Sequence, residues 1–185
     1  KLNVGCGPHY AHGWVNTDLI RTDTITPDVV VDADNPFPFP AATFERAYVG
    51  HVLEHIPWGD VPDWLDRLAR VLVDDAVALF VGPDVIRALN RWRDHAEPWE
   101  KVAGIIESTD AYHDGELRWD ADRHHWNCHE GRVAAALTAC GWRNVTPLGV
   151  LAPIDDWFHD SGTRDGHAIR VAGWPLVSDA TCQFA

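Results

Sequence analysis

The chain begins with a short apolar strand that runs into a Gly-x-Gly turn, followed by a second short strand that ends on a carboxylate. The turn is Gly5-Cys6-Gly7, and the carboxylate is Asp18. In open α/β sheets, such a turn lets the backbone approach a ligand, while the carboxylate accepts hydrogen bonds from ribose hydroxyls. The pattern therefore predicts an α/β sheet with a pocket for a small nucleoside-containing molecule. Gly-x-Gly by itself also occurs in ordinary turns.

The same segment argues against a dinucleotide. Dinucleotide folds carry a third glycine three residues after the second, so that helix and strand pack closely around a pyrophosphate. Here that position is Tyr10, and Pro8 and His9 crowd the turn. Asp18 follows Gly7 by 11 residues, whereas the usual spacing is about 20. A nucleoside without phosphates fits better than NAD or FAD, which leaves a nucleotide-dependent oxidoreductase as the less favoured alternative.

The following segments predict a mostly parallel sheet. Five segments are almost continuously apolar, which is typical of strands covered on both faces. They lie at 1–5, 14–18, 28–33, 46–51 and 76–82. Residues 58–72 have apolar side chains at helical spacing and charged side chains between them, which predicts an amphipathic helix. We therefore expect a doubly wound α/β fold.

The regular pattern breaks after the fifth strand. Residues 84–128 are rich in tryptophan and histidine and contain several prolines and glycines, which predicts short helices and loops. An insertion at the carboxyl edge of a parallel sheet lies over the ligand crevice, so this segment is a candidate lid. With 185 residues and no internal repeat, the chain 1–185 is expected to form a single domain.

The last third predicts one more helix and two strands. The helix is expected at about 129–140, with Asn127 as its N-cap and Gly141 as its C-cap. The strands are expected at about 144–151 and 167–173.

Composition restricts the partners of the chain. The net charge is −13 at pH 7, and such a field repels phosphate backbones, so no nucleic-acid partner is expected. No apolar run approaches the roughly 20 residues of a membrane span, and no signal peptide is visible. The sequence therefore predicts a cytosolic protein without a membrane segment.

Two histidine-rich segments raise the question of a metal site. His51-Val52-Leu53-Glu54-His55 matches the H-x-x-E-H of zinc peptidases, which needs both histidines on one face of a continuous helix. Here the motif follows an apolar strand and precedes Pro57, which is disfavoured inside a helix. Residues 124–130 hold three more histidines, but neighbouring side chains point in different directions, and a helix start explains the segment. No metal site is predicted.

Four motifs occur in order along the chain: Leu2 to Gly7, Gly13 to Asp18, Asp32 to Phe39 ahead of Thr43-Phe44-Glu45, and His51 to Ile56. With them the chain resembles the class I S-adenosylmethionine-dependent methyltransferases, in particular the group often labelled methyltransferase type 11. The resemblance is closest over residues 2–82 and looser over 124–173. It implies a Rossmann-like fold with a mostly parallel seven-stranded sheet, S-adenosylmethionine as cofactor and methyl transfer as activity. The chain departs from the pattern in its short connection between the first two strands and in Glu45, where an aspartate is usual.

The resemblance also implies a set of residues around the cofactor: Gly5, Cys6, Gly7, Asp18, Asp32, Ala33 and His51. The glycine turn would lie against the methionine half, and Asp18 would accept hydrogen bonds from the ribose. Asp32 and Ala33 would hold the adenine edge, and His51 would line the pocket beside the sulfonium.

Methyl transfer from a sulfonium is an in-line displacement, so the protein mainly orients the reactants and excludes water. A hydroxyl acceptor also needs a base, and the candidates are His51 and Asp84 at the strand ends and His125 from the lid region. His51 could equally shape the cofactor pocket, and Asp84 could cap the following helix. The expected acceptor is a small molecule with a hydroxyl or amine, including sugar-like compounds. The alternative is a non-catalytic module that binds S-adenosylmethionine.

Overall fold

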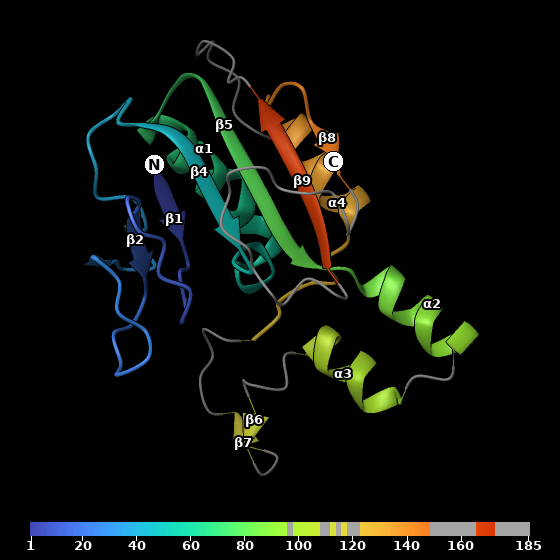
Figure 1. Ribbon diagram of the computed structural model, residues 1–185. Helices are drawn as coiled ribbons and strands as arrows, with labels where there is room; N and C mark the ends of the chain where they lie inside the picture. The colour runs from blue at the N-terminus through green and yellow to red at the C-terminus, as the bar shows by residue number, and fades with distance from the viewer. Residues whose placement is uncertain (96–97, 108–111, 114–115, 118–122, 149–165, 173–185) are drawn as a thin grey trace.

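A computed structural model describes residues 1–95, 98–107, 112–113, 116–117, 123–148 and 166–172. In this part of the chain, seven strands form one sheet in the order β3-β2-β1-β4-β5-β9-β8 (Figure 1). They are β1 (Leu2–Val4), β2 (Val15–Asp18), β3 (Val29–Val30), β4 (Phe44–Gly50), β5 (Leu72–Pro83), β8 (Thr146–Pro147) and β9 (Gly166–Ala172). The first five strands are parallel to one another, while β9 is antiparallel to β5 and to β8. The expected α/β fold with a mostly parallel sheet is confirmed.

The strand order reverses at β1, which lies between β2 and β4. Leu2 pairs with Val15 on one side and with Ala47 on the other. Connections that leave the carboxyl ends of β1 and β4 therefore run in opposite directions and open a crevice at that edge. This topology places the glycine turn after β1 and the histidine motif after β4 next to each other.

The helices and 3₁₀ turns follow the strands in chain order: η1 (Leu53–His55), η2 (Trp58–Asp60), α1 (Val61–Val71), α2 (Val85–His95), α3 (Trp99–Glu107) and α4 (Glu130–Ala139). A separate two-stranded sheet consists of β6 (Tyr112–His113) and β7 (Glu116–Leu117). Figure 1 shows α2 and α3 beyond the carboxyl end of β5. These two helices thus extend past the sheet edge, and the role of residues 84–128 as a lid stays a prediction.

The core lies between the sheet and one layer of helices. Leu65 and Leu68 of α1, Leu137 of α4 and Phe80 of β5 belong to one buried cluster, and Figure 1 shows both helices on the same side of the sheet. Leu79, the neighbour of Phe80, belongs to a second cluster, because successive side chains of a strand point to opposite faces.

On the second face of the sheet, the described residues form a smaller buried cluster. This cluster consists of Tyr48, Leu79 and Val81 with Trp14 and Leu148 packed against them. Residues 5–14 and 19–28, which connect the first three strands, form no helix. These connections are too short to include one, since a parallel crossover with a helix needs a dozen or more residues.

The boundaries of the described elements agree with the predicted ones to within a few residues, but one helix cap differs. The structure begins α4 at Glu130, so its N-cap is His129, whose Nδ1 accepts a hydrogen bond from the Arg132 N–H at 3.3 Å. Asn127 lies too early in the chain, because a cap must directly precede the first helical turn. Gly141 follows the helix with φ of 78°, as expected of a glycine at this end.

No helix in the described ranges combines the length and the apolar character needed to cross a membrane.

Candidate active site

The glycine turn after β1 depends on backbone conformations that favour glycine. Gly5 and Gly7 have φ of 65° and 50°, in the left-handed region. A Cβ atom on Gly5 would lie 2.4 Å from Cγ2 of Val52, so the turn also packs tightly against the segment after β4. The Cys6 N–H donates to the Thr17 carbonyl at 2.9 Å. The turn is therefore held against β2 and exposes its backbone to the crevice.

Asp18 joins the turn to β2. Its Oδ2 accepts a hydrogen bond from the Gly7 N–H at 2.8 Å. The side chain is only partly buried and lines the cavity described below. Burial raises the pKa of the neighbouring Cys6 thiol to about 11, and the charges of Asp18 and Asp28 add to this shift. Cys6 therefore stays protonated near neutral pH and is a lining group rather than a nucleophile.

A network of buried polar side chains supports the glycine turn, and it was not predicted from the sequence analysis. Asn3 and Asn16 are fully buried, and Asn3 Nδ2 donates to Asn16 Oδ1 at 2.9 Å. Asn16 Oδ1 also accepts from the Ala11 N–H, and Asn16 Nδ2 donates to Asp28 Oδ2. Hydrogen bonds from the backbone and side chain of Asn16 and from Tyr10 hold the pKa of Asp28 below its ordinary value. The network fixes the short connection between β1 and β2.

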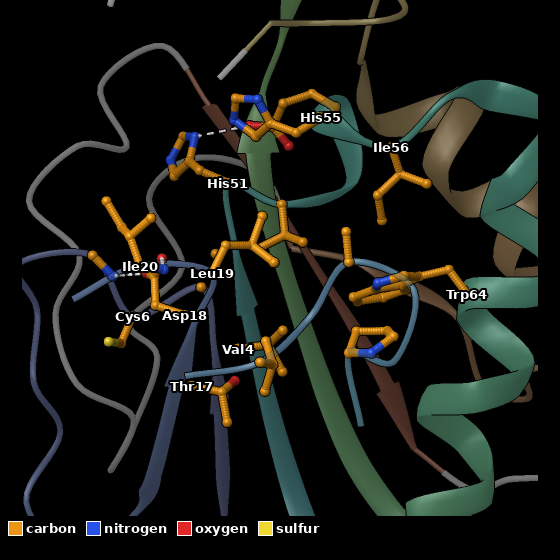
Figure 2. A pocket seen from close by; sticks show the side chains of 18 of the residues that line it. Val4, Cys6, Thr17, Asp18, Leu19, Ile20, His51, His55, Ile56 and Trp64 are labelled. Carbon is orange, nitrogen blue, oxygen red and sulfur yellow. Dashed lines mark hydrogen bonds and ion pairs between the residues drawn. The ribbon is translucent and has the colours of Figure 1, made fainter. Parts of the chain in front are cut away.

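A cavity of about 1100 Å³ runs along the carboxyl edge of the sheet, from the glycine turn to the lid region. Figure 2 shows Asp18, His51 and Trp64 around it, from β2, the end of β4 and α1. Of the nine residues implied or proposed for the site, six line the cavity: Gly5, Cys6, Gly7, Asp18, Ala33 and His51. The other three, Asp32, Asp84 and His125, do not line it.

Asp32 lies in an exposed turn beside the cavity. Its Oδ1 accepts a hydrogen bond from the Asp34 N–H at 3.0 Å, and the Asn35 N–H donates to its carbonyl. The flanking residues Val31, Ala33 and Asp34 line the cavity instead. One oxygen of the Asp32 carboxylate is engaged in its own turn, and its contact with adenine stays a prediction.

Asp84 and His125 are held by other interactions. The Asp84 Oδ1 accepts from the Arg87 N–H at 3.0 Å and so caps the start of α2, which is the structural alternative that the sequence allowed. The side chain of His125 is exposed, while its backbone N–H donates to the Glu54 carbonyl at 2.8 Å. The adjacent His124 lines the cavity in its place.

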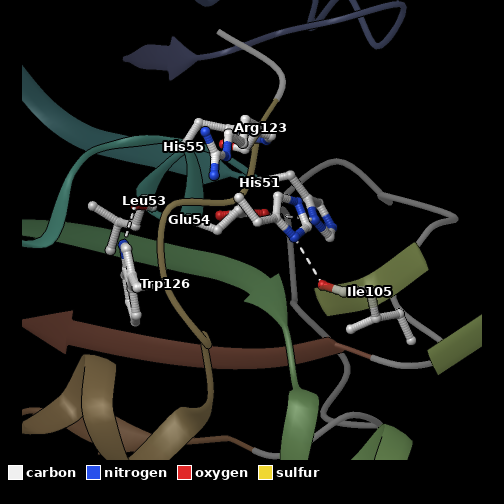
Figure 3. A network of polar contacts seen from close by, with 8 residues as sticks. His51, Leu53, Glu54, His55, Ile105, Arg123 and Trp126 are labelled. Atoms are coloured by element: carbon white, nitrogen blue, oxygen red, sulfur yellow. Dashed lines mark hydrogen bonds and ion pairs between the residues drawn. The ribbon is translucent and has the colours of Figure 1, made fainter. Parts of the chain in front are cut away.

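His51 lies at the entrance of the cavity in a strained conformation. Its φ is 54°, and its N–H donates to the Val81 carbonyl at 2.8 Å, which ties the end of β4 to β5. Its Nδ1 lies 3.2 Å from Oε1 of Glu54 (Figure 3). A non-glycine residue in the left-handed region is uncommon and is often found at functional sites. The conformation turns the imidazole toward the cavity and toward the carboxylate.

Glu54 is a fully buried carboxylate that lines the same cavity. Burial alone raises the pKa of Glu54, but the hydrogen bond from His51 and the charges of His51, His55 and His124 outweigh it. The pKa of Glu54 therefore lies below its ordinary value, and the group is ionised at neutral pH.

Glu54, His55 and His124 are cavity residues that the sequence did not assign. The H-x-x-E-H pattern contained the first two, and the structure agrees that it is no α-helix, since η1 is a 3₁₀ turn. His124 comes from the segment before α4, and its Nδ1 lies 2.8 Å from the Ile105 carbonyl. Burial lowers the pKa of His124, with smaller contributions from Glu54, which raises it, and from His55, which lowers it.

Trp126 anchors this segment to η1. Its Nε1 donates to the carbonyls of Leu53 and Ile56, each at 3.0 Å. Its ring packs edge-on against Trp58, and the Arg132 guanidinium lies 3.9 Å above the centre of the Trp58 ring. Chain segments about 70 residues apart are thereby held together above the carboxyl end of β4.

Solved structures with a similar fold indicate the fold family. A methyltransferase dependent on S-adenosylmethionine (SAM) from Archaeoglobus fulgidus aligns over 92% of this chain and 84% of its own, with a TM-score of 0.56 and 14% identity. The fold is that of the SAM-dependent methyltransferases. The 1,6-didemethyltoxoflavin-N1-methyltransferase of Burkholderia thailandensis, solved with 1,6-didemethyltoxoflavin and S-adenosylhomocysteine, aligns over 94% of this chain and 70% of its own (TM-score 0.57, 14% identity). A SAM-dependent methyltransferase from Methanosarcina mazei aligns over 95% and 92% (TM-score 0.55, 16% identity).

No protein-family model matches the chain, and comparison with curated proteins finds no significant match. At these levels of identity the solved structures establish the fold.

Proposed function

We propose that this protein transfers a methyl group from S-adenosylmethionine to a small-molecule acceptor. The observation that carries the proposal is the position of Asp18, beside the Gly5–Gly7 turn and at the edge where the strand order reverses. Open α/β sheets bind nucleotide-like ligands at this place, and a carboxylate after the second strand is suited to ribose hydroxyls. The methyltransferase fold and the S-adenosylhomocysteine in the Burkholderia thailandensis structure support the same cofactor.

The size and charge of the cavity support a small-molecule acceptor. Pockets for single small ligands typically measure about 300–1,000 Å³, and this cavity of about 1100 Å³ leaves room beside a cofactor. Asp34, Asp60 and Asp63 also line it, which favours a neutral or cationic acceptor over an anionic one. One neighbour in the fold family, the Burkholderia thailandensis enzyme, was solved with a small molecule.

His51 is the proposed general base for an acceptor that must lose a proton. It lines the cavity, and Glu54 Oε1 lies 3.2 Å from its Nδ1. A carboxylate in this position orients an imidazole and stabilises its protonated form, as it does in other carboxylate–histidine pairs. Asp84 and His125 are less suitable bases, because neither lines the cavity.

The test is calorimetric titration with S-adenosylmethionine and S-adenosylhomocysteine. We expect Asp18→Ala to weaken binding by about 10- to 100-fold, since a hydrogen bond to a charged group contributes about 1.5–3 kcal/mol. Asp23→Ala is the matched control, because Asp23 is exposed and does not line the cavity. A folded wild-type protein that binds neither compound would remove the proposal, and binding of NADH instead would favour the oxidoreductase.

A non-catalytic binding module is distinguished by His51→Ala. If the protein is an enzyme with His51 as its base, this variant retains cofactor binding but loses turnover of a hydroxyl acceptor.

A further inference from the structure

We propose that Glu54, His55 and His124 form a binding site for a divalent transition-metal ion of the zinc class. One potential ligand atom from each side chain lies within 4.8 Å of the other two. Glu54 and His55 belong to η1, while His124 comes from the segment that Trp126 anchors to the same turn. The three side chains therefore converge from two parts of the chain that are distant in sequence.

The buried carboxylate of Glu54 lacks a partner for one of its oxygens. Oε1 lies 3.2 Å from His51 Nδ1, but no donor within the described ranges is hydrogen-bonded to Oε2. An ionised carboxylate that is fully buried is costly unless its charge is compensated. A cation bound to Oε2 would supply this compensation, and His51 would support the ligating carboxylate from its other side.

Both histidines are oriented in the way that metal ligands in proteins usually are. The Nδ1 atoms of His124 and His55 lie 2.8 Å and 3.3 Å from the carbonyls of Ile105 and Arg123 (Figure 3). A carbonyl only accepts hydrogen bonds, so each Nδ1 carries a proton, and Nε2 is then the atom of each ring that can bind a metal ion when the imidazole is neutral. Ligating histidines commonly donate their second N–H to a backbone carbonyl, which fixes the tautomer and the ring orientation.

The ligand set indicates the class of metal. Two imidazoles and one carboxylate bind zinc in catalytic sites that keep a further position open, and related ions such as Co²⁺ accept the same ligands. A tetrahedral zinc ion with bonds of about 2.0–2.1 Å holds its ligand atoms roughly 3.3 Å apart. The separation of up to 4.8 Å therefore has to shrink by about 1.5 Å when the ion binds.

The open position would face the cavity, because all three side chains line it. Resting on the proposed function, we infer that the bound ion would hold the oxygen or nitrogen of the acceptor and lower its pKa, as a Lewis acid does. This replaces the prediction of no metal site from the sequence. That prediction rested on the helix that the H-x-x-E-H motif of zinc peptidases needs, whereas the structure brings His124 close to Glu54 and His55 of the motif without such a helix.

The experiment is titration of chelator-treated protein with Co²⁺, followed by its visible absorption, and with Zn²⁺ by calorimetry. We expect one ion per chain in the wild type and in His125→Ala, the matched control whose side chain is exposed and next in sequence. His124→Ala and His55→Ala should each bind at least 10- to 100-fold more weakly. If Glu54→Gln does not fold, His55→Ala and His124→Ala still test the site, because they remove ligands from two different segments of the chain.

Equal binding by wild type and His124→Ala would overturn the metal site, and so would a folded wild type without Co²⁺ absorption. The result is separable from the proposed function by titrating S-adenosylhomocysteine into the metal-free protein. Cofactor binding without Co²⁺ binding removes the metal site alone, whereas Co²⁺ binding without cofactor binding removes the methyltransferase proposal alone.

Discussion

At the scale of single residues, Gly5 carries the strictest requirement in the cavity wall. Its φ of 65° disfavours any side chain, and a Cβ atom would lie 2.4 Å from Val52 Cγ2. We expect Gly5→Ala to lower the free energy of unfolding by about 2–5 kcal/mol, because a left-handed conformation costs about 1–2 kcal/mol and overpacking adds about 1–3 kcal/mol. Urea unfolding followed by circular dichroism measures the change.

Substitutions at two other glycines allow the conformational cost to be measured separately from the cost of overpacking. Gly7 has φ of 50°, but a Cβ atom added to it would lie in open space, so Gly7→Ala should show the conformational cost alone. Gly59 has open space and no positive φ, so Gly59→Ala should change stability by less than about 0.5 kcal/mol. If Gly5→Ala proved no more destabilising than Gly7→Ala, the close approach of Val52 would not matter energetically.

At the scale of elements, the docking of residues 123–129 onto η1 assembles the histidine side of the cavity. We expect Trp126→Phe to destabilise the fold by about 1–3 kcal/mol, because an aromatic ring remains while the carbonyls of Leu53 and Ile56 lose the indole N–H as a donor. The control is Trp99→Phe, since the exposed Trp99 should tolerate the change within about 0.5 kcal/mol. Equal stabilities of the two variants in urea would show that the hydrogen bonds of Trp126 contribute little.

At the scale of the whole molecule, two perturbed groups of the cavity predict that the fold is weakened by acid. The pKa of His124 is lowered in the folded state, mainly by burial, and the pKa of Glu54 is also lowered. Each group therefore binds protons more readily in the unfolded chain. The stability that they contribute is complete above about pH 6.5, the ordinary pKa of histidine, and is lost as the pH falls through the folded-state values.

The measurement is urea unfolding of the wild type and His124→Asn at several pH values between about 5 and 8. Stability should fall more steeply toward acid in the wild type, because the variant lacks the buried imidazole. His12→Asn, at an exposed histidine, should keep the wild-type profile. If the stability of the wild type and of His124→Asn fell equally toward acid, His124 would not be a source of the acid sensitivity.

The local pattern of the sequence determined the central elements of the fold. Apolar runs marked the five parallel strands, and the helical spacing of Leu65 and Leu68 marked α1, because side-chain period is a local property of the chain. The glycine turn and Asp18 could be located for the same reason, since both lie within a few residues of a strand end.

Only the tertiary structure decided which histidines and carboxylates meet at the cavity. His124 and His125 are neighbours in sequence, yet only His124 lines the cavity, because the hydrogen bonds of Trp126 set how this segment docks on η1. The sequence left Asp84 open as a base or as a helix cap, and in the structure its Oδ1 caps the start of α2. Side chains that are neighbours in sequence point in different directions. Local spacing therefore does not determine which of them faces the cavity, and contacts with distant parts of the chain decide it. The sequence therefore determined the fold and the cofactor edge, while long-range packing determined the opposite wall of the site.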